Sequence, residues 1–263
     1  MHIDTFDHYQ NQESLIHERD PRVKVVITLA FILSNVLLPD GAWLAFGYSW
    51  CVVLLVSWLA RLDFRFLFSR SLVALPFALA AVTAVFALPG ETIWALRIGS
   101  WQLNATDTGL IRFSSILLRS WVSIQMAIVL TASTPFPDLI HALRHLKTPD
   151  ILVSTISFMY RYMFVLSDEA LRMLRAREAR SARTLSNRDG GSIAWRARIT
   201  GNMAGQLFLR SYERSERVYN AMLARGYQGT LLTLNPHHMQ LGDWVAGGVG
   251  LLILILIQWM SRV

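Results

Sequence analysis

The sequence predicts an all-α, polytopic membrane protein with about five transmembrane helices and long cytoplasmic helices. Two observations on composition support this prediction. Hydrophobic residues make up 53% of the 263 residues and charged residues only 16%, whereas a soluble domain averages about 25% charged residues. The formal net charge is nevertheless +7 and the mean hydropathy is +0.37. Such a hydrophobic chain is not intrinsically disordered, and its positive charge must gather outside the apolar runs.

Four apolar runs are long enough, or nearly so, to cross a hydrocarbon core that takes about 20 helical residues. The first three are followed by Pro39, Arg61 and Pro89, which are suitable span boundaries. We expect transmembrane helices over Val23–Leu38, Ala42–Ala60, Leu72–Leu88 and Trp244–Met260.

A further span is expected over Gly109–Ala132, although its first half contains Arg112 and Arg119. Charged residues inside a span are costly and usually face protein or water. The polar side of this helix should therefore face the bundle interior or a partner. The alternative is a helix that lies on the membrane surface.

The stretch Ile151–Leu166 is apolar but contains several polar residues, among them Ser154 and Arg161. Residues 133–243 hold 15 of the 25 basic residues. Basic residues favour the cytoplasmic side, and most of this block would be external if Ile151–Leu166 crossed the membrane. We therefore interpret it as non-spanning. Five spans then remain, with the N-terminus inside and the C-terminus outside.

These assignments divide the chain into three regions. An N-terminal tail and four-helix membrane region covers 1–132, a cytoplasmic helical region covers 133–243, and the final transmembrane helix covers 244–263. The external loop 89–108 alternates apolar and other residues about Gly99-Ser100, which predicts a small β-hairpin. We expect no cleavable signal peptide, because the first 22 residues are polar and acidic.

Helix-capping signals organise the cytoplasmic region. Pro149 and Asp150 are typical of a helix start, and nothing breaks that helix before Asn187. Ser192 is a suitable N-cap and Gly226 a suitable terminator for a second long helix. The expected helices are Pro137–Leu146, 150–187 and Ile193–Arg225. Gly201 and Gly205 share one face of the last helix and predict a close helix contact.

Each long helix is expected to end in a similar short motif. The motifs are Ala179-Arg180-Ser181 and Ala224-Arg225-Gly226. Small neighbours would let each arginine enter an acidic groove, where a guanidinium can bind a carboxylate with two hydrogen bonds. The alternative is an ordinary solvated basic face, or one that contacts anionic lipid.

Several kinds of chemistry are not predicted. Neither Lys24 nor Lys147 follows a glycine, so the chain has no P-loop for ATP. The single cysteine, Cys51, rules out an internal disulfide and a C-x-x-C motif. His141 and His145 lie four residues apart, but no third ligand accompanies them, so surface histidines are the preferred interpretation over a metal site. We predict no catalytic residue, no cofactor, and no binding of nucleic acid in this membrane context.

Over nearly its whole length the chain resembles the transmembrane coupling (T) component of energy-coupling-factor (ECF) transporters, in the cobalt-type CbiQ branch. The two arginine motifs match the Ala-Arg-Gly motifs of that family, except that Ser181 stands where glycine is usual. The other matching stretches are Asp20-Pro21-Arg22-Val23-Lys24, Thr134-Pro135-Phe136-Pro137-Asp138-Leu139 with Ala142-Leu143-Arg144, and Tyr160-Arg161-Tyr162 with Asp168-Glu169-Ala170.

The resemblance implies a non-catalytic subunit of an ATP-driven cobalt importer in a bacterial inner membrane. Arg180 and Arg225 would each dock in one subunit of a dimer of ATP-binding-cassette (ABC) ATPases. The apolar parts of the long helices, Ile151–Leu166 and Ile199–Leu209, would hold the substrate-binding membrane (S) subunit. ATP-driven closure of the ATPases would then move the helices and tilt that subunit.

Other functions remain open at this stage. The substrate could be nickel or a vitamin such as biotin, because no residue of this chain identifies it. An integral-membrane enzyme would need a convergent set of acid, base or metal groups, which we cannot assemble from the sequence. A free-standing permease would transport its substrate without ATPase partners.

Overall fold

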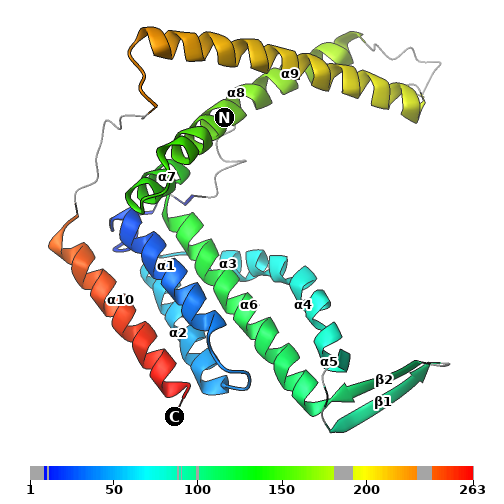
Figure 1. Ribbon diagram of the computed structural model, residues 1–263, viewed down its shortest axis with the longest axis vertical. Helices are drawn as coiled ribbons and strands as arrows, with labels where there is room; N and C mark the ends of the chain where they lie inside the picture. Colours follow the sequence, from blue (N-terminus) through cyan, green and yellow to red (C-terminus); the bar gives the residue numbers. More distant parts are fainter. Residues whose placement is uncertain are drawn as a thin grey trace. The chain divides into compact units, whose positions relative to one another are not determined.

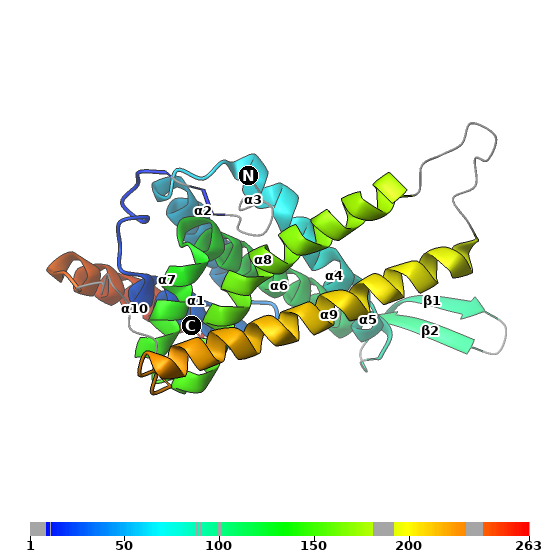
Figure 2. The same cartoon turned by 90° about the horizontal axis from the view of Figure 1, so that it is seen from above.

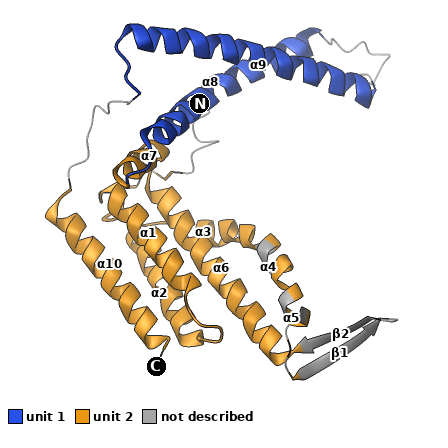
Figure 3. Cartoon of the chain, viewed as in Figure 1, with its two compact units in different colours: residues 1–3, 147–235 blue, residues 4–146, 236–263 orange. Residues whose placement is uncertain are grey.

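The computed structural model describes residues 9–10, 12–87, 89, 91–98, 101–180, 192–229 and 239–262 (Figure 1). The chain divides into two compact units, shown in different colours in Figure 3. One comprises 4–146 and 236–263 and is called the bundle unit here. The other comprises 1–3 and 147–235 and is called the helix-pair unit.

The bundle unit is helical apart from one β-hairpin. Its long helices are α1 (Pro21–Val36), α2 (Trp43–Leu59), α6 (Asp107–Ser133) and α10 (Leu241–Met260). Its short elements are α3 (Phe64–Ser71), the 3-10 helix η2 (Leu72–Ala74), α4 (Leu75–Ala81), α5 (Thr83–Ala87) and α7 (Phe136–His145). The strands β1 (Thr92–Ile98) and β2 (Trp101–Thr106) pair antiparallel, with Ile98 opposite Trp101, which confirms the predicted hairpin. Its turn lies outside the described residues.

The predicted spans are reproduced unevenly. Among the described helices, α6 and α10 are long and apolar enough to cross a membrane, and α2 is a shorter apolar helix of 17 residues. The predicted continuous helix Leu72–Leu88 is wrong, because this run is divided into η2, α4 and α5. Pro76 explains the break before α4: proline cannot donate the hydrogen bond of a helix interior but fits a first turn, where it lies.

The core of the bundle unit is built around α6, which contacts α1 to α5. Phe31 of α1, Val53 of α2 and Leu67 of α3 pack with Val122 and other side chains of α6. Large apolar side chains also cover the outer surface, and exposed examples on the long helices include Leu33, Leu44, Trp244, Ile255 and Trp259. A soluble monomer rarely exposes so large an apolar surface, so this surface suits lipid.

Helix α10 packs closely on α1, although more than 200 residues separate them in sequence. A Cβ atom added at Gly250 would lie only 3.1 Å from Ile27 Cδ1, so the glycine lets the two helices approach. At the far end, Gln258 Nε2 donates to the carbonyl and the hydroxyl oxygen of Ser34, at 2.6 and 3.0 Å. Small residues and one polar pair thus hold α10 in the bundle.

The two arginines of α6 both turn to the loop between α1 and α2. Arg119 Nη2 donates to Leu38 O at 2.7 Å and to Asp40 Oδ1 at 3.1 Å, and the Arg119 side chain is 19% exposed. Arg112 is 53% exposed and lies 3.9 Å from the same carboxylate. The polar side of α6 therefore contacts its own bundle, which was one of the two predicted arrangements.

The opposite end of the bundle unit is held by buried polar contacts. Lys24 Nζ donates to His17 O at 3.0 Å and to Ser133 O at 3.2 Å, which joins the N-terminal segment, α1 and the end of α6. The backbone N–H of Asp20 donates to Asp243 Oδ1 at 3.3 Å, which adds the start of α10. These contacts join the N-terminal segment, α1, α6 and α10 at this end of the bundle unit.

The helix-pair unit consists of α8 (Asp150–Arg180) and α9 (Ile193–Ala224), which are the two long helices seen from above in Figure 2. Ser192 accepts a hydrogen bond from the N–H of Trp195 at 3.3 Å, so α9 begins at the predicted N-cap. The predicted extension of α8 beyond Arg180 lies outside the described residues. Among the residues that the structure describes, no atom lies within 4 Å of a Cβ added at Gly201 or Gly205, so the close helix contact expected there is not seen in that part of the chain.

Candidate functional site

The motif Ala224-Arg225-Gly226 forms a complete helix stop at the end of α9. Gly226 has φ +82°, and its N–H donates to Leu223 O at 3.0 Å while the N–H of Tyr227 donates to Met222 O at 3.0 Å. These two bonds define the Schellman motif, in which glycine takes the left-handed conformation that ends a helix. Gly226 is therefore explained by the left-handed backbone conformation that ends α9.

This helix stop determines how Arg225 is presented. Arg225 occupies the C-cap and is exposed, and its neighbours Ala224 and Gly226 are small. A cation at a helix C-terminus is favoured by the partial negative charge of the last carbonyl groups. Arg225 is therefore a positively charged tip with little steric cover.

The other motif is only partly described. Ala179 and Arg180 are the last two residues of α8, and both are exposed, whereas Ser181 lies outside the described residues. Because α8 and α9 run antiparallel, their C-terminal ends lie at opposite ends of the helix pair. The structure thus makes two separate arginine tips and does not bring Arg180 and Arg225 into one site.

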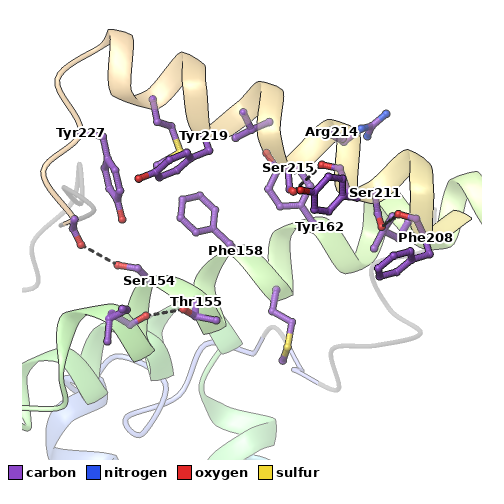
Figure 4. Close-up of a pocket in the computed structure, with 17 residues that line it drawn as sticks. Ser154, Thr155, Phe158, Tyr162, Phe208, Ser211, Arg214, Ser215, Tyr219 and Tyr227 are labelled. Atoms are coloured by element: carbon purple, nitrogen blue, oxygen red, sulfur yellow. Dashed lines mark hydrogen bonds between the residues drawn. The ribbon is translucent and has the colours of Figure 1, made fainter.

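Between the two tips lies an aromatic groove of about 790 Å³, shown in Figure 4. Phe158 and Tyr162 of α8 are stacked, with ring centroids 6.4 Å apart. Phe208 and Tyr219 of α9 also lie on the groove in Figure 4, and Tyr212 is a further aromatic residue that lines it. Near the start of α8, Ser154 Oγ lies 3.5 Å from Gly229 O and links α8 to the segment after α9. Such an open apolar groove suits a helix face of a partner.

The groove differs in part from the predicted apolar surface. It uses residues of α8 between Ile151 and Leu166, as expected, but on α9 it runs from Phe208 to Met222. The predicted α9 stretch, Ile199–Leu209, contributes Phe208 alone among the groove residues. The recurrence of Phe208, Tyr212, Ser215 and Tyr219 at three- or four-residue spacing is a helical signal, which could have located this face from the sequence.

Glu169 makes an electrostatic contact between the two helices. Its Oε1 accepts from Arg210 Nη1 of α9, and its Oε2 accepts from Arg172 Nη2 of α8 at 2.8 Å. The hydrogen bond from Arg210 lowers the pKa of Glu169 below the usual 4.5, and Arg172 contributes in the same direction. Arg172 therefore pairs with Glu169, which lies three residues before it on the same helix.

The histidine pair of α7 is engaged in other contacts. The rings of His141 and His145 meet edge to face, with centroids 4.8 Å apart. Arg22 Nη2 lies 2.8 Å from His145 Nε2, so that nitrogen must accept the hydrogen bond as neutral imidazole. Burial and then the charge of Arg22 lower the pKa of His145. Within the described ranges, no group of three histidine, cysteine or acidic residues is placed to hold a metal ion.

Comparison with known proteins identifies the family and several similar proteins. The family model of the CbiQ cobalt transport protein matches residues 12–237. The chain is 28% identical to the ECF transporter transmembrane protein EcfT of Lactobacillus helveticus, over 83% of this chain and 79% of that protein. It is 26% identical to the cobalt transport protein CbiQ of Salmonella typhimurium, over 80% of this chain and 91% of that protein. It is also 30% identical to the nickel permease LarQ of Lactiplantibacillus plantarum, over 48% of this chain and 44% of that protein.

Proposed function

Since the chain belongs to the CbiQ family of cobalt transport proteins, a family of membrane transport components, we propose that it couples ATP hydrolysis by partner subunits to the import of Co²⁺. In this proposal the chain is the T component of an ECF transporter. It contributes neither an ATP site nor a catalytic residue. A dimer of ABC ATPases hydrolyses ATP, and a membrane S subunit binds the ion.

The observation that carries the proposal is the pair of arginine tips on α8 and α9. A dimer of identical or similar ATPases presents two similar grooves, one on each subunit. Arg180 and Arg225 each enter one groove and bind a carboxylate by charge-assisted hydrogen bonds. Placement at opposite ends of the helix pair suits two grooves better than one.

The two helices are the mechanical link in this proposal. Each is more than 30 residues long, which corresponds to about 45 Å at about 1.5 Å per residue. When the ATPases close, the arginine tips move with them and the crossing of α8 and α9 changes. The S subunit lies on the aromatic groove between the helices, so the same movement tilts it.

The proposed topology places the arginine tips where ATP is available. The chain crosses a bacterial inner membrane five times, with the N-terminus and residues 133–243 in the cytoplasm and the C-terminus outside. This rests on the concentration of basic residues in 133–243. The apolar outer surface of the bundle unit contacts lipid.

Co-purification with the ATPases tests the docking role. We expect Arg180→Ala and Arg225→Ala each to reduce the ATPase that co-purifies with the tagged chain, and the double variant to retain none. The matched control is the double variant Arg175→Ala/Arg198→Ala, which removes two exposed arginines of the same helices outside the two motifs. Wild-type ATPase recovery with the double tip variant would contradict the proposal.

The similarity to a nickel permease supports Ni²⁺ as a second candidate substrate. Uptake of radioactive Co²⁺, Ni²⁺ and biotin by cells that carry the complete transporter distinguishes the candidates. We expect Co²⁺ to be taken up and to be competed only weakly by the other two. Preferred uptake of Ni²⁺ or biotin would change the substrate but leave the coupling role in place.

A further inference from the structure

We propose that Glu169 is a positioning residue that fixes the crossing of α8 and α9 and thereby the separation of Arg180 and Arg225. This inference rests on the proposed coupling function, because the separation of the tips matters only if both dock in partner grooves. Glu169 itself is not expected to touch the ATPases or the substrate.

The geometry around Glu169 is that of an interhelical clamp. Each carboxylate oxygen accepts from a different arginine, one on its own helix and one on α9. The Glu169 side chain is 19% exposed, whereas Arg172 and Arg210 are 61% and 57% exposed. The arginines therefore reach inward over a carboxylate that is largely covered. The lowered pKa of Glu169 keeps it charged at physiological pH.

A second contact, between α8 and the segment that follows α9, allows the Glu169 contact to set the angle between the two helices. Ser154 and Gly229 are in contact near the start of α8, and Glu169 lies 15 residues further along that helix. One contact alone would act as a pivot, but two contacts at separate points define the angle between the helices. Loss of the Glu169 contact removes one of these two points and leaves the Ser154–Gly229 contact as the pivot.

Arg180 lies beyond the clamp, so a change of angle is amplified at that tip. When the Glu169 contact is lost, the Ser154–Gly229 contact acts as the pivot, and Arg180 follows Ser154 by 26 residues, or about 39 Å of helix. A tilt of about 10° would therefore move the Arg180 end by about 7 Å. That displacement exceeds the length of a hydrogen bond, so an ATPase stroke would be transmitted less efficiently.

A neighbouring ion pair provides the matched control. Glu213 and Arg217 are both on α9, 3.9 Å apart, and their side chains are 67% and 71% exposed. Such an exposed pair within one helix contributes little. Glu213→Gln removes the same charge close to the crossing without removing an interhelical contact.

The experiment compares Glu169→Gln and Glu213→Gln in the complete transporter. In a Cys51→Ser background, nitroxide labels at Leu174→Cys and Asn220→Cys report the distance between the ends of α8 and α9. We expect Glu169→Gln to broaden this distance distribution and to lower the ions imported per ATP hydrolysed by roughly 1.4- to five-fold, the range that corresponds to loss of one ion pair with exposed arginines. ATPase co-purification should remain, because Arg180 and Arg225 are intact.

The inference is wrong if Glu169→Gln and Glu213→Gln give the same distance distribution and the same coupling ratio as the wild type. Arg210→Gln should reproduce the effect of Glu169→Gln, and the double variant should be no worse than either single one, because both remove the same contact. Failure of the wild-type chain to bind ATPases would instead refute the proposed function, while the distance measurement would still test the clamp.

Discussion

Replacement of Arg119 by methionine should destabilise the bundle unit strongly. Methionine keeps much of the side-chain length but cannot donate to Leu38 O or Asp40, and it also removes the guanidinium from above the Phe46 ring, 5.9 Å from its centroid. A hydrogen bond that involves a charged group contributes about 1.5–3 kcal/mol. Asp40 is 38% exposed, so water compensates part of the loss, and we expect a net destabilisation of about 2–4 kcal/mol.

Arg112 provides the control, because it lies beside the same carboxylate of Asp40. Arg112→Met removes an equal charge that lies 3.9 Å from Asp40 and is 53% exposed, so we expect a cost of at most about 1 kcal/mol. Thermal unfolding of the detergent-solubilised chain, followed by tryptophan fluorescence, should show a Tm lower by about 5–10 °C for Arg119→Met. Equal Tm values for the two variants would refute the argument that Arg119 anchors the loop between α1 and α2.

Three further predictions concern backbone conformation, titration and packing. Gly226→Ala should accelerate hydrogen exchange at the end of α9, because alanine in the left-handed conformation costs about 1–2 kcal/mol. Gly205→Ala should instead slow exchange in mid-helix, because alanine favours a helix interior and both sites have room for a Cβ. A change of the same sign in both variants would contradict this reasoning. Burial lowers the pKa of His17 from 6.5, so its contribution to stability should be present above pH 6.5 and lost as the pH falls through the lowered pKa. His17→Gln should flatten this part of the profile of Tm against pH. A profile that the substitution leaves unchanged would exclude His17 as the source of this pH dependence. Gly250→Leu should force α10 away from Ile27 and lower the Tm, and a variant as stable as the wild type would show that the helices do not pack there.

The elements that the sequence predicted best have local causes. Helix α9 begins after Ser192 and ends before Gly226 because each cap is a short-range hydrogen-bonding pattern. The β-hairpin also follows from the alternation of apolar and other residues on either side of Gly99-Ser100 in the sequence. In contrast, one continuous helix over Leu72–Leu88 was predicted from hydropathy alone. Hydropathy does not take into account that Pro76 lies in the first turn of a new helix.

The candidate site was predicted only where a single helix defines it. The arginine motifs are local, and Arg225 lies at a helix end as expected. The contact between Glu169 and Arg210, and the part of α9 that lines the groove, depend on how two helices cross. Side-chain periodicity gives the faces of each helix but not the angle between them, so these features required the structure.

ATP-driven Co²⁺ uptake into proteoliposomes tests the coupling claim most directly. Three preparations are compared: the chain alone, the chain with the ATPases and the S subunit, and the same complex with Arg180→Ala/Arg225→Ala. The account predicts uptake by the complete wild-type complex, and none by the chain alone or by the double variant. Uptake by the chain alone, or wild-type uptake by the double variant, would contradict it.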